Sequence, residues 1–107
     1  GVTHRPVLHH IAERYLADTY APENVAGLTG IPAPRIRALA HEIARVAFDQ
    51  AMSIPEVWTD FRGVTRPAFT GRPVSFHAMR GISAHSNGFQ TARALHVLQV
   101  LLCAVET

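Results

Sequence analysis

The chain has 107 residues, of which 48% are hydrophobic, and its ten basic residues exceed its eight acidic residues by a formal net charge of +2. This length fits one small domain or a piece of a larger one, and the composition excludes a disordered chain. The single cysteine, Cys103, excludes an internal disulfide or a cysteine-based cluster site, and no apolar run is long enough for a transmembrane helix. The chain starts without methionine and stops after an apolar run, so we expect a fragment of a longer protein.

Two helices are predicted near the N-terminus. Apolar residues recur at helical spacing between Pro6 and Thr19, which predicts the first helix. Pro22 and Glu23 suit the start of a second, short helix, because proline is tolerated at the first helical position and carboxylates stabilise the N-terminal end. Gly27 or Gly30 is expected to end that helix.

A turn at residues 29–32 leads into a third predicted helix, Pro34 to about Phe48, with one apolar face. The two helices and the turn form a helix-turn-helix. An alternative function therefore is nucleic-acid binding through residues 24–44, with Arg35 and Arg37 at the start of a recognition helix. The basic residues of the chain are scattered, however, and do not concentrate on this unit.

The second half predicts an irregular connection followed by a strand, a loop and a helix. Residues 51–72 show no clean period, and we expect at most a helical turn near residues 55–60. Residues 73–79 alternate between apolar and polar side chains, as strands do. A loop over residues 80–88 then precedes an apolar helix at residues 89–105, which we expect to be buried on most sides in the intact protein and to enclose a buried, inert cysteine.

The loop combines two glycines with short polar side chains. Gly81 and Gly88 permit close approach of the backbone to a ligand, and we expect one of them at positive φ in a non-helical loop. Ser83, His85 and Asn87 offer hydrogen bonds, and the following helix directs free N–H groups towards an anion. Taken alone, this pattern also describes an ordinary strand-to-helix turn.

Three stretches resemble the molybdopterin oxidoreductases of the dimethyl sulfoxide reductase family. RGISAHSNGFQTARALHVLQVLL is similar to a loop-and-helix segment of that family, and YAPENVAGLTGIPAPRIRALAHEIA is similar to a segment upstream of it. WTDFRG and GRPVSFHAMRG resemble most the sulfur-compound branch, which includes sulfite- and tetrathionate-type enzymes. The family's iron–sulfur cysteine motif and any molybdenum ligand are missing here, and Cys103 stands where many relatives have glycine.

The resemblance implies a helix-rich piece of a larger α/β domain that binds molybdenum bis-(molybdopterin guanine dinucleotide). The residues it places against the cofactor are Arg80, Gly81, Ile82, Ser83, His85, Asn87 and Gly88. It implies no catalytic residue and no metal ligand in this chain, and it allows an iron–sulfur cluster elsewhere in the protein. The implied partners are the rest of the catalytic subunit, an iron–sulfur electron-transfer subunit and a small-molecule substrate, with no nucleic acid.

The chain is thus interpreted as one fragment, residues 1–107, with a helical part at residues 1–50, a connection at 51–72 and a strand-loop-helix part at 73–107. A lone strand cannot satisfy its own edges. The isolated chain is therefore expected to pair strands between copies or to expose apolar surface, to hold no cofactor and to be inactive. The resemblance leaves the location open between the cytoplasmic and periplasmic faces of a bacterial membrane complex.

Overall fold

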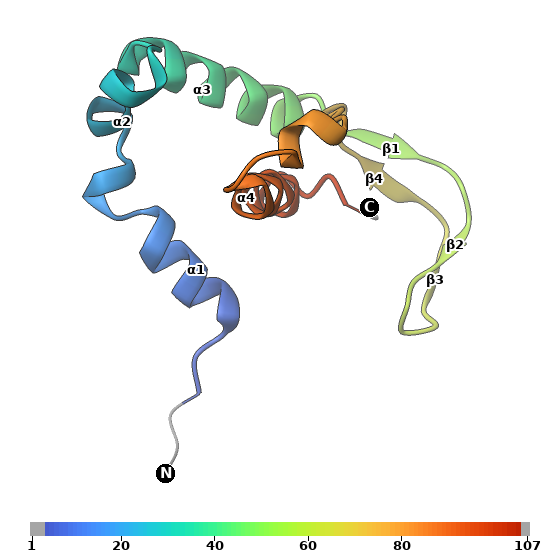
Figure 1. The fold of residues 1–107 in the computed structure, drawn as a ribbon. Helices are drawn as coiled ribbons and strands as arrows, with labels where there is room; N and C mark the ends of the chain where they lie inside the picture. The colour runs from blue at the N-terminus through green and yellow to red at the C-terminus, as the bar shows by residue number, and fades with distance from the viewer. Residues whose placement is uncertain (1–3, 106–107) are drawn as a thin grey trace. The chain divides into compact units, whose positions relative to one another are not determined.

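The protein is a helix-rich chain with mixed α and β structure, as the sequence predicts. A computed structural model describes residues 4–105, in which four α-helices and two 3-10 helices accompany four short strands (Figure 1). The chain divides into two compact units, Gly1–His41 and Glu42–Thr107, and the boundary falls within the third α-helix. Within residues 4–105, no helix is long and apolar enough to cross a membrane.

The first helix is shorter than predicted. α1 spans Val7–Tyr15, and a separate 3-10 helix, η1, spans Asp18–Tyr20. Ala17 between them is extended, with φ −63° and ψ 142°. The side-chain amide of Asn24 donates a hydrogen bond to the carbonyl oxygen of Asp18. Such local side-chain bonds compete with a continuing helix, which explains why the helical periodicity overestimated the length of α1.

The predicted helix-turn-helix is confirmed. α2 spans Pro22–Thr29, with Pro22 in its first turn, and it ends at Gly30, whose φ is 70°. Glycine reaches this left-handed conformation without a Cβ clash, so it is the common residue after a helix. α3 then spans Ala33–Asp49.

A bidentate ion pair joins α2 to the first half of α3. The Arg37 guanidinium donates from Nε to Glu23 Oε1 at 3.0 Å and from Nη2 to Oε2 at 2.8 Å. This hydrogen bonding holds the pKa of the Glu23 carboxyl below its ordinary value. Arg37 is therefore already committed to a carboxylate within its own unit.

Residues 51–72 form a β-ribbon, so the prediction of an irregular connection was wrong. β1 (Met52–Ile54) pairs antiparallel with β4 (Phe69–Gly71), and β2 (Trp58–Thr59) pairs antiparallel with β3 (Thr65–Arg66). The four strands run as two successive ladders of one hairpin arm (Figure 1). The helical turn expected near residues 55–60 is absent, because residues 58–59 belong to β2.

Two prolines explain why the ribbon escaped the sequence pattern. Pro55 follows β1 and Pro67 lies between β3 and β4, at the break between the two ladders. Proline cannot donate to a ladder, so each pairing is limited to two or three residues. Ladders this short leave no recognisable alternation, and their existence depends on a partner more than ten residues away in the chain.

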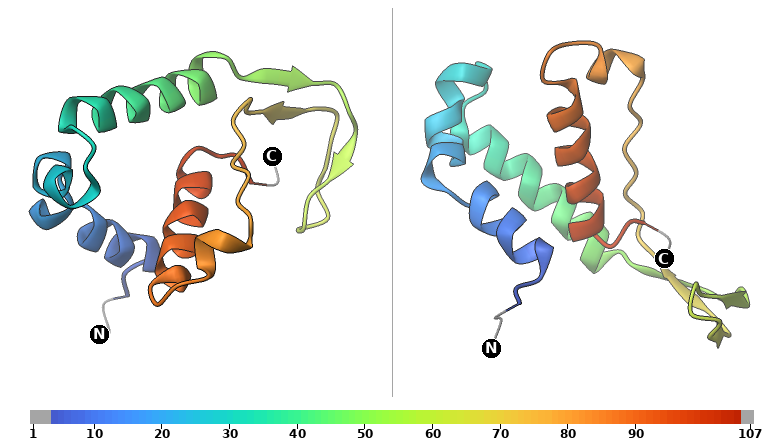
Figure 2. Two further views of the ribbon diagram at one scale, coloured as in Figure 1. Left: turned by 45° about the horizontal axis from the view of Figure 1, so that its top comes forward. Right: turned by 60° about the horizontal axis from the view of Figure 1, so that its bottom comes forward.

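Residues 73–79 are extended but unpaired, which corrects the predicted strand. Val74 and Phe76 are half-buried while Ser75 and His77 are exposed, so the alternation of side chains is present. No described segment supplies a ladder partner, and the stretch instead runs beside the last helix in the opposite direction (Figure 2). Alternation therefore reports one face against a helix here, and not membership of a sheet.

The predicted non-helical loop contains a helix. Arg80–Ser83 form a 3-10 helix, η2, and α4 begins at Gly88 and ends at Leu101. Neither Gly81 nor Gly88 has positive φ, so that expectation was also wrong; the described glycines with positive φ are Gly30 and Gly63. η2 and α4 contact each other directly.

Cys103 is exposed and lies beyond the end of α4, not buried within a helix as predicted. It adopts left-handed geometry with φ 51°. Its N–H donates to the Val100 carbonyl, and the Ala104 N–H donates to the Gln99 carbonyl, each at 3.0 Å. This pair of bonds is the Schellman motif, in which the left-handed residue is usually glycine.

The apolar core is very small. Among residues 4–105, the buried apolar side chains are Ala47 and Leu102, at 0% and 4% exposure. Leu98 of α4 is 36% exposed and Val100 is 54% exposed. The predicted burial of α4 on most sides is thus not achieved within this chain, and it remains a prediction for the intact protein.

Candidate functional site

An open groove lies between residues 76–79, η2 and α4. Its volume is about 370 Å³. Three of the seven residues predicted to bind cofactor line it, namely Arg80, Ile82 and Ser83. The other lining residues are Phe76, Ala78, Met79, Ala92, Leu95, His96 and Gln99. The predicted loop and the helix that follows it therefore do form the walls of one concave surface.

The three predicted residues in the groove have different roles. Ser83 Oγ donates to the Arg80 carbonyl at 3.1 Å, and the Ile82 N–H donates to the Met79 carbonyl at 3.1 Å, so both bonds hold the 3-10 turn. Arg80 is exposed and forms no ion pair within residues 4–105. Its guanidinium is therefore the available positive charge on this wall.

His85 and Asn87 lie outside the groove on an exposed turn. The His85 Nδ1 donates to the Asn87 side-chain oxygen. The Asn87 side chain consequently does not cap α4, although asparagine is a favoured capping residue. The amides at the start of α4 thus lack the side-chain acceptor that usually satisfies them.

The two glycines differ in what surrounds them. A Cβ on Gly88 would overlap the Ser83 carbonyl group, whereas a Cβ on Gly81 would meet nothing within 4 Å. Gly88 is therefore required for the close approach of η2 to the start of α4. The close approach expected at this glycine is to the chain's own backbone.

Two polar residues of the groove, His96 and Gln99, were not among the predicted cofactor-binding residues. His96 Nδ1 and Gln99 Oε1 are 3.1 Å apart on α4. A signal was present in the sequence, because Gln90, Arg93, His96 and Gln99 recur at three-residue spacing and form one polar seam on an otherwise apolar helix. Only the turn back along residues 76–79 shows which part of that seam faces a cavity.

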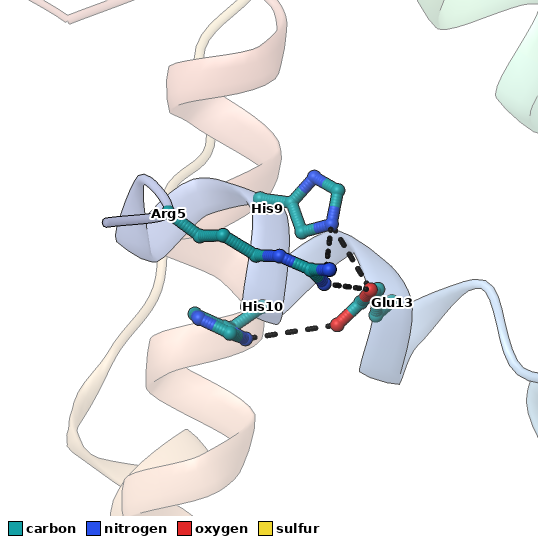
Figure 3. Close-up of polar contacts among 4 residues, drawn as sticks. All are labelled: Arg5, His9, His10 and Glu13. Carbon is teal, nitrogen blue, oxygen red and sulfur yellow. Dashed lines mark hydrogen bonds and ion pairs between the residues drawn. The ribbon is translucent and has the colours of Figure 1, made fainter. Parts of the chain in front are cut away.

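A second polar cluster lies on α1, around the carboxylate of Glu13 (Figure 3). His9 Nε2 is 3.0 Å from Oε1, Arg5 Nη1 is 3.3 Å from the same oxygen, and His10 Nδ1 is 3.6 Å from Oε2. All four side chains are at least half exposed. Exposed pairs of this kind contribute little stability, and no group of three histidine, cysteine or acidic residues within residues 4–105 is arranged to hold a metal ion.

The groove fits part of the implied cofactor. Ligand pockets span roughly 300–1,000 Å³, and this groove is at the lower end of that range. Its apolar walls suit a flat heterocycle, while Arg80, His96 and Gln99 supply polar groups at the rim. A complete guanine dinucleotide needs more surface than this segment provides.

One curated protein is similar to almost the whole chain. The chain is 47% identical over 106 residues to the A-type subunit of sulfite dehydrogenase from Allochromatium vinosum. The match covers 99% of this chain but 11% of that protein. No known family profile matches the chain, and no solved structure matches it either. The chain is thus similar to a short segment of a sulfur-compound oxidoreductase.

Proposed function

We propose that this chain is a segment of the catalytic subunit of an oxidoreductase that acts on a small inorganic sulfur compound. The observation that carries the proposal is the 47% identity, over 106 residues, to a segment of the sulfite dehydrogenase protein. The resemblance of the WTDFRG and GRPVSFHAMRG stretches to sulfur-compound enzymes agrees with this similarity. The sparse core also supports a role as part of a larger fold.

The segment's role in this proposal is to help hold a molybdopterin guanine dinucleotide, whose metal supplies two-electron redox chemistry when the cofactor is bound. Arg80 would interact with its phosphates, because a guanidinium presents paired donors to phosphate oxygens. The backbone of Gly81 and Ile82 and the side chain of Ser83 would border the pterin. His85, Asn87 and Gly88 belong to the turn that connects η2 to α4, and they would support the groove indirectly.

The cofactor proposal is tested by replacing Arg80 with glutamine in the intact protein. Loss of a hydrogen bond to a charged group costs about 1.5–3 kcal/mol, so molybdenum and pterin content per folded protein should fall. Arg93→Gln is the matched control, because Arg93 lies on the same helix as part of the groove wall but does not line the groove. Full cofactor content in Arg80→Gln would refute the role of this residue.

The enzyme proposal has a separate test. The intact protein is assayed for electron transfer from sulfite or thiosulfate to an artificial acceptor, with molybdenum content measured on the same sample. Activity with either substrate is expected, and the isolated 107-residue chain is expected to show none. An intact protein without molybdenum and without such activity would refute the proposal.

Nucleic-acid binding through α2 and α3 is the alternative proposal. The ion pair between Arg37 and Glu23 speaks against it, because one of the two arginines on the supposed recognition helix is already neutralised. Fluorescence anisotropy with duplex DNA at physiological salt distinguishes the two functions. Binding that is lost in Arg35→Ala and retained in Arg14→Ala would favour the alternative.

A further inference from the structure

A second hollow, of about 310 Å³, lies in the unit formed by residues 42–107. It is lined by the β-ribbon on one side and by the turn after α4 on the other. The lining residues are Trp58, Arg66, Ala68, Phe69, Thr70, Arg72 and Cys103. None of them belongs to the groove described above, so whatever this hollow binds is independent of the proposed cofactor segment.

The polar groups of this hollow are mainly donors. Two arginines contribute to its lining, and no carboxylate does. Asp60 pairs with one of them, since its Oδ2 is 3.5 Å from Arg66 Nη2. A guanidinium carries five N–H donors, so this single pairing leaves Arg66 with donors to spare.

Two buried donor atoms on the lining residues have no partner. Trp58 Nε1 and Arg72 Nε are both inaccessible to solvent, and neither has a hydrogen-bond partner within residues 4–105. Buried polar groups are nearly always satisfied in native proteins, and an unsatisfied one often marks a missing ligand, ion or water. The indole N–H can only donate, so its missing partner must be an acceptor.

The surroundings hold both donors in place. Trp58 packs edge-to-face on Phe69, with ring centroids 6.1 Å apart. Arg72 Nη1 donates to the Ala47 carbonyl at 3.0 Å, and its guanidinium lies 5.1 Å from the Phe48 ring centroid. Both side chains are therefore fixed before any ligand arrives, which lowers the entropic cost of binding.

We propose that this hollow is a binding site for a small tetrahedral oxyanion, of the sulfate or phosphate type. Such an ion offers only acceptor oxygens and negative charge, which complement two arginines and an indole N–H. A neutral ligand would leave the arginine charges unmatched, and a cation would be repelled. The chemistry recognised is shared by sulfur and phosphorus oxyanions, so the experiment compares both.

The exposed thiol of Cys103 provides a local reporter, because it is part of the wall of the hollow. In the intact protein, the rate of Cys103 alkylation by neutral iodoacetamide is measured by mass spectrometry of the peptide that contains it. Sodium sulfate and sodium phosphate are the probes, and sodium chloride at equal ionic strength is the control. An oxyanion at about ten times its dissociation constant should slow labelling roughly tenfold by occupying the site.

Three variants locate the effect. Arg66→Gln removes one charge at an exposed position, and Trp58→Phe removes the indole N–H while it keeps an aromatic ring against Phe69. Each should reduce the protection several-fold. Arg62→Gln makes the same charge change at the ribbon tip, outside the hollow, and should leave protection intact. Equal labelling with sulfate, phosphate and chloride, or protection that survives Arg66→Gln and Trp58→Phe unchanged, would overturn the proposal.

Discussion

At the scale of single residues, Gly88 shows how a glycine can serve packing within its own chain. We predict that Gly88→Ala lowers the free energy of unfolding by about 1–3 kcal/mol, the usual cost of overpacking. The new Cβ would overlap the Ser83 carbonyl group, and backbone cannot yield as a flexible side chain can. Urea denaturation of the two proteins measures the difference.

Gly81→Ala is the matched control for that prediction. Its Cβ would meet nothing within 4 Å, and its φ is not positive, so a change within about 0.5 kcal/mol is expected. Equal losses for both substitutions would show that the close approach of η2 to α4 is not what Gly88 provides. For the same reason, the effect of Gly88→Val on cofactor content would be confounded by a damaged fold.

Asp60 is the residue that organises the tip of the β-ribbon. Its Oδ1 accepts hydrogen bonds from the amides of Arg62 and Val64, each at 2.9 Å, and the turn closes through Gly63 with φ 78°. The bond from the Val64 amide is the main cause that keeps the pKa of the Asp60 carboxyl below its ordinary value of 3.8, and the Arg62 amide and Arg66 lower that pKa further. The carboxylate form is therefore the one that the folded turn prefers.

The pH dependence of the tip follows from that direction. A lowered folded-state pKa contributes stability that is fully present above 3.8 and is lost as the pH falls through the lower folded value. We predict that the amide NMR signals of Arg62 and Val64 shift towards random-coil positions over that acidic range. Asp60→Asn retains an acceptor oxygen but no charge, so its tip signals should not respond; an identical titration in both proteins would contradict the assignment.

At the scale of elements, the end of α4 is closed by the wrong residue type for its conformation. Cys103 occupies the left-handed position of a Schellman motif with φ 51°. This geometry costs a non-glycine residue roughly 1–2 kcal/mol. We predict that Cys103→Gly raises the free energy of unfolding by about 1 kcal/mol, measured by urea denaturation. Cys103→Ala also removes the thiol but keeps the Cβ, so a matching gain there would contradict the explanation.

The β-ribbon shows the limit of sequence patterns for elements. Its registers, such as Met52 opposite Gly71 and Trp58 opposite Arg66, join residues that are not neighbours in the chain. The helix-turn-helix, in contrast, depends on Pro22 at the start of α2 and Gly30 at its end, and both act on their immediate neighbours. Local chemistry was predictable for this reason, and the pairing was not.

At the scale of the whole molecule, the apolar surface left uncovered is the dominant feature. Leu16, Leu28 and Phe61 are 82%, 88% and 89% exposed. We predict that the isolated 107-residue chain self-associates and binds a hydrophobic dye, because burial stabilises by about 25 cal/mol per Å² of apolar surface. Sedimentation velocity over a range of concentrations tests this, and Leu28→Glu should weaken association. A monodisperse monomer that binds no dye would contradict the prediction.

The candidate site was predictable in part. The segment around Arg80, Ile82 and Ser83 does line a groove, as the resemblance implied, although its backbone is a 3-10 helix. The hydrogen bond between His85 and Asn87 removed both side chains from that role. A pairing of this kind depends on the conformation of the turn, which the order of residues alone does not define. Whether the groove binds the implied cofactor stays a prediction.

The amino-acid sequence by itself determined where α2, α3 and α4 form, because helical periodicity, proline at a helix start and glycine at a helix end act within a few residues. Three other features required the folded chain: the ribbon at residues 52–71, the unpaired stretch at residues 73–79 and the hollow beside Cys103. Each arises when distant segments meet. A strand exists only with a partner, and a cavity exists only between neighbours, so contacts across the chain decide both.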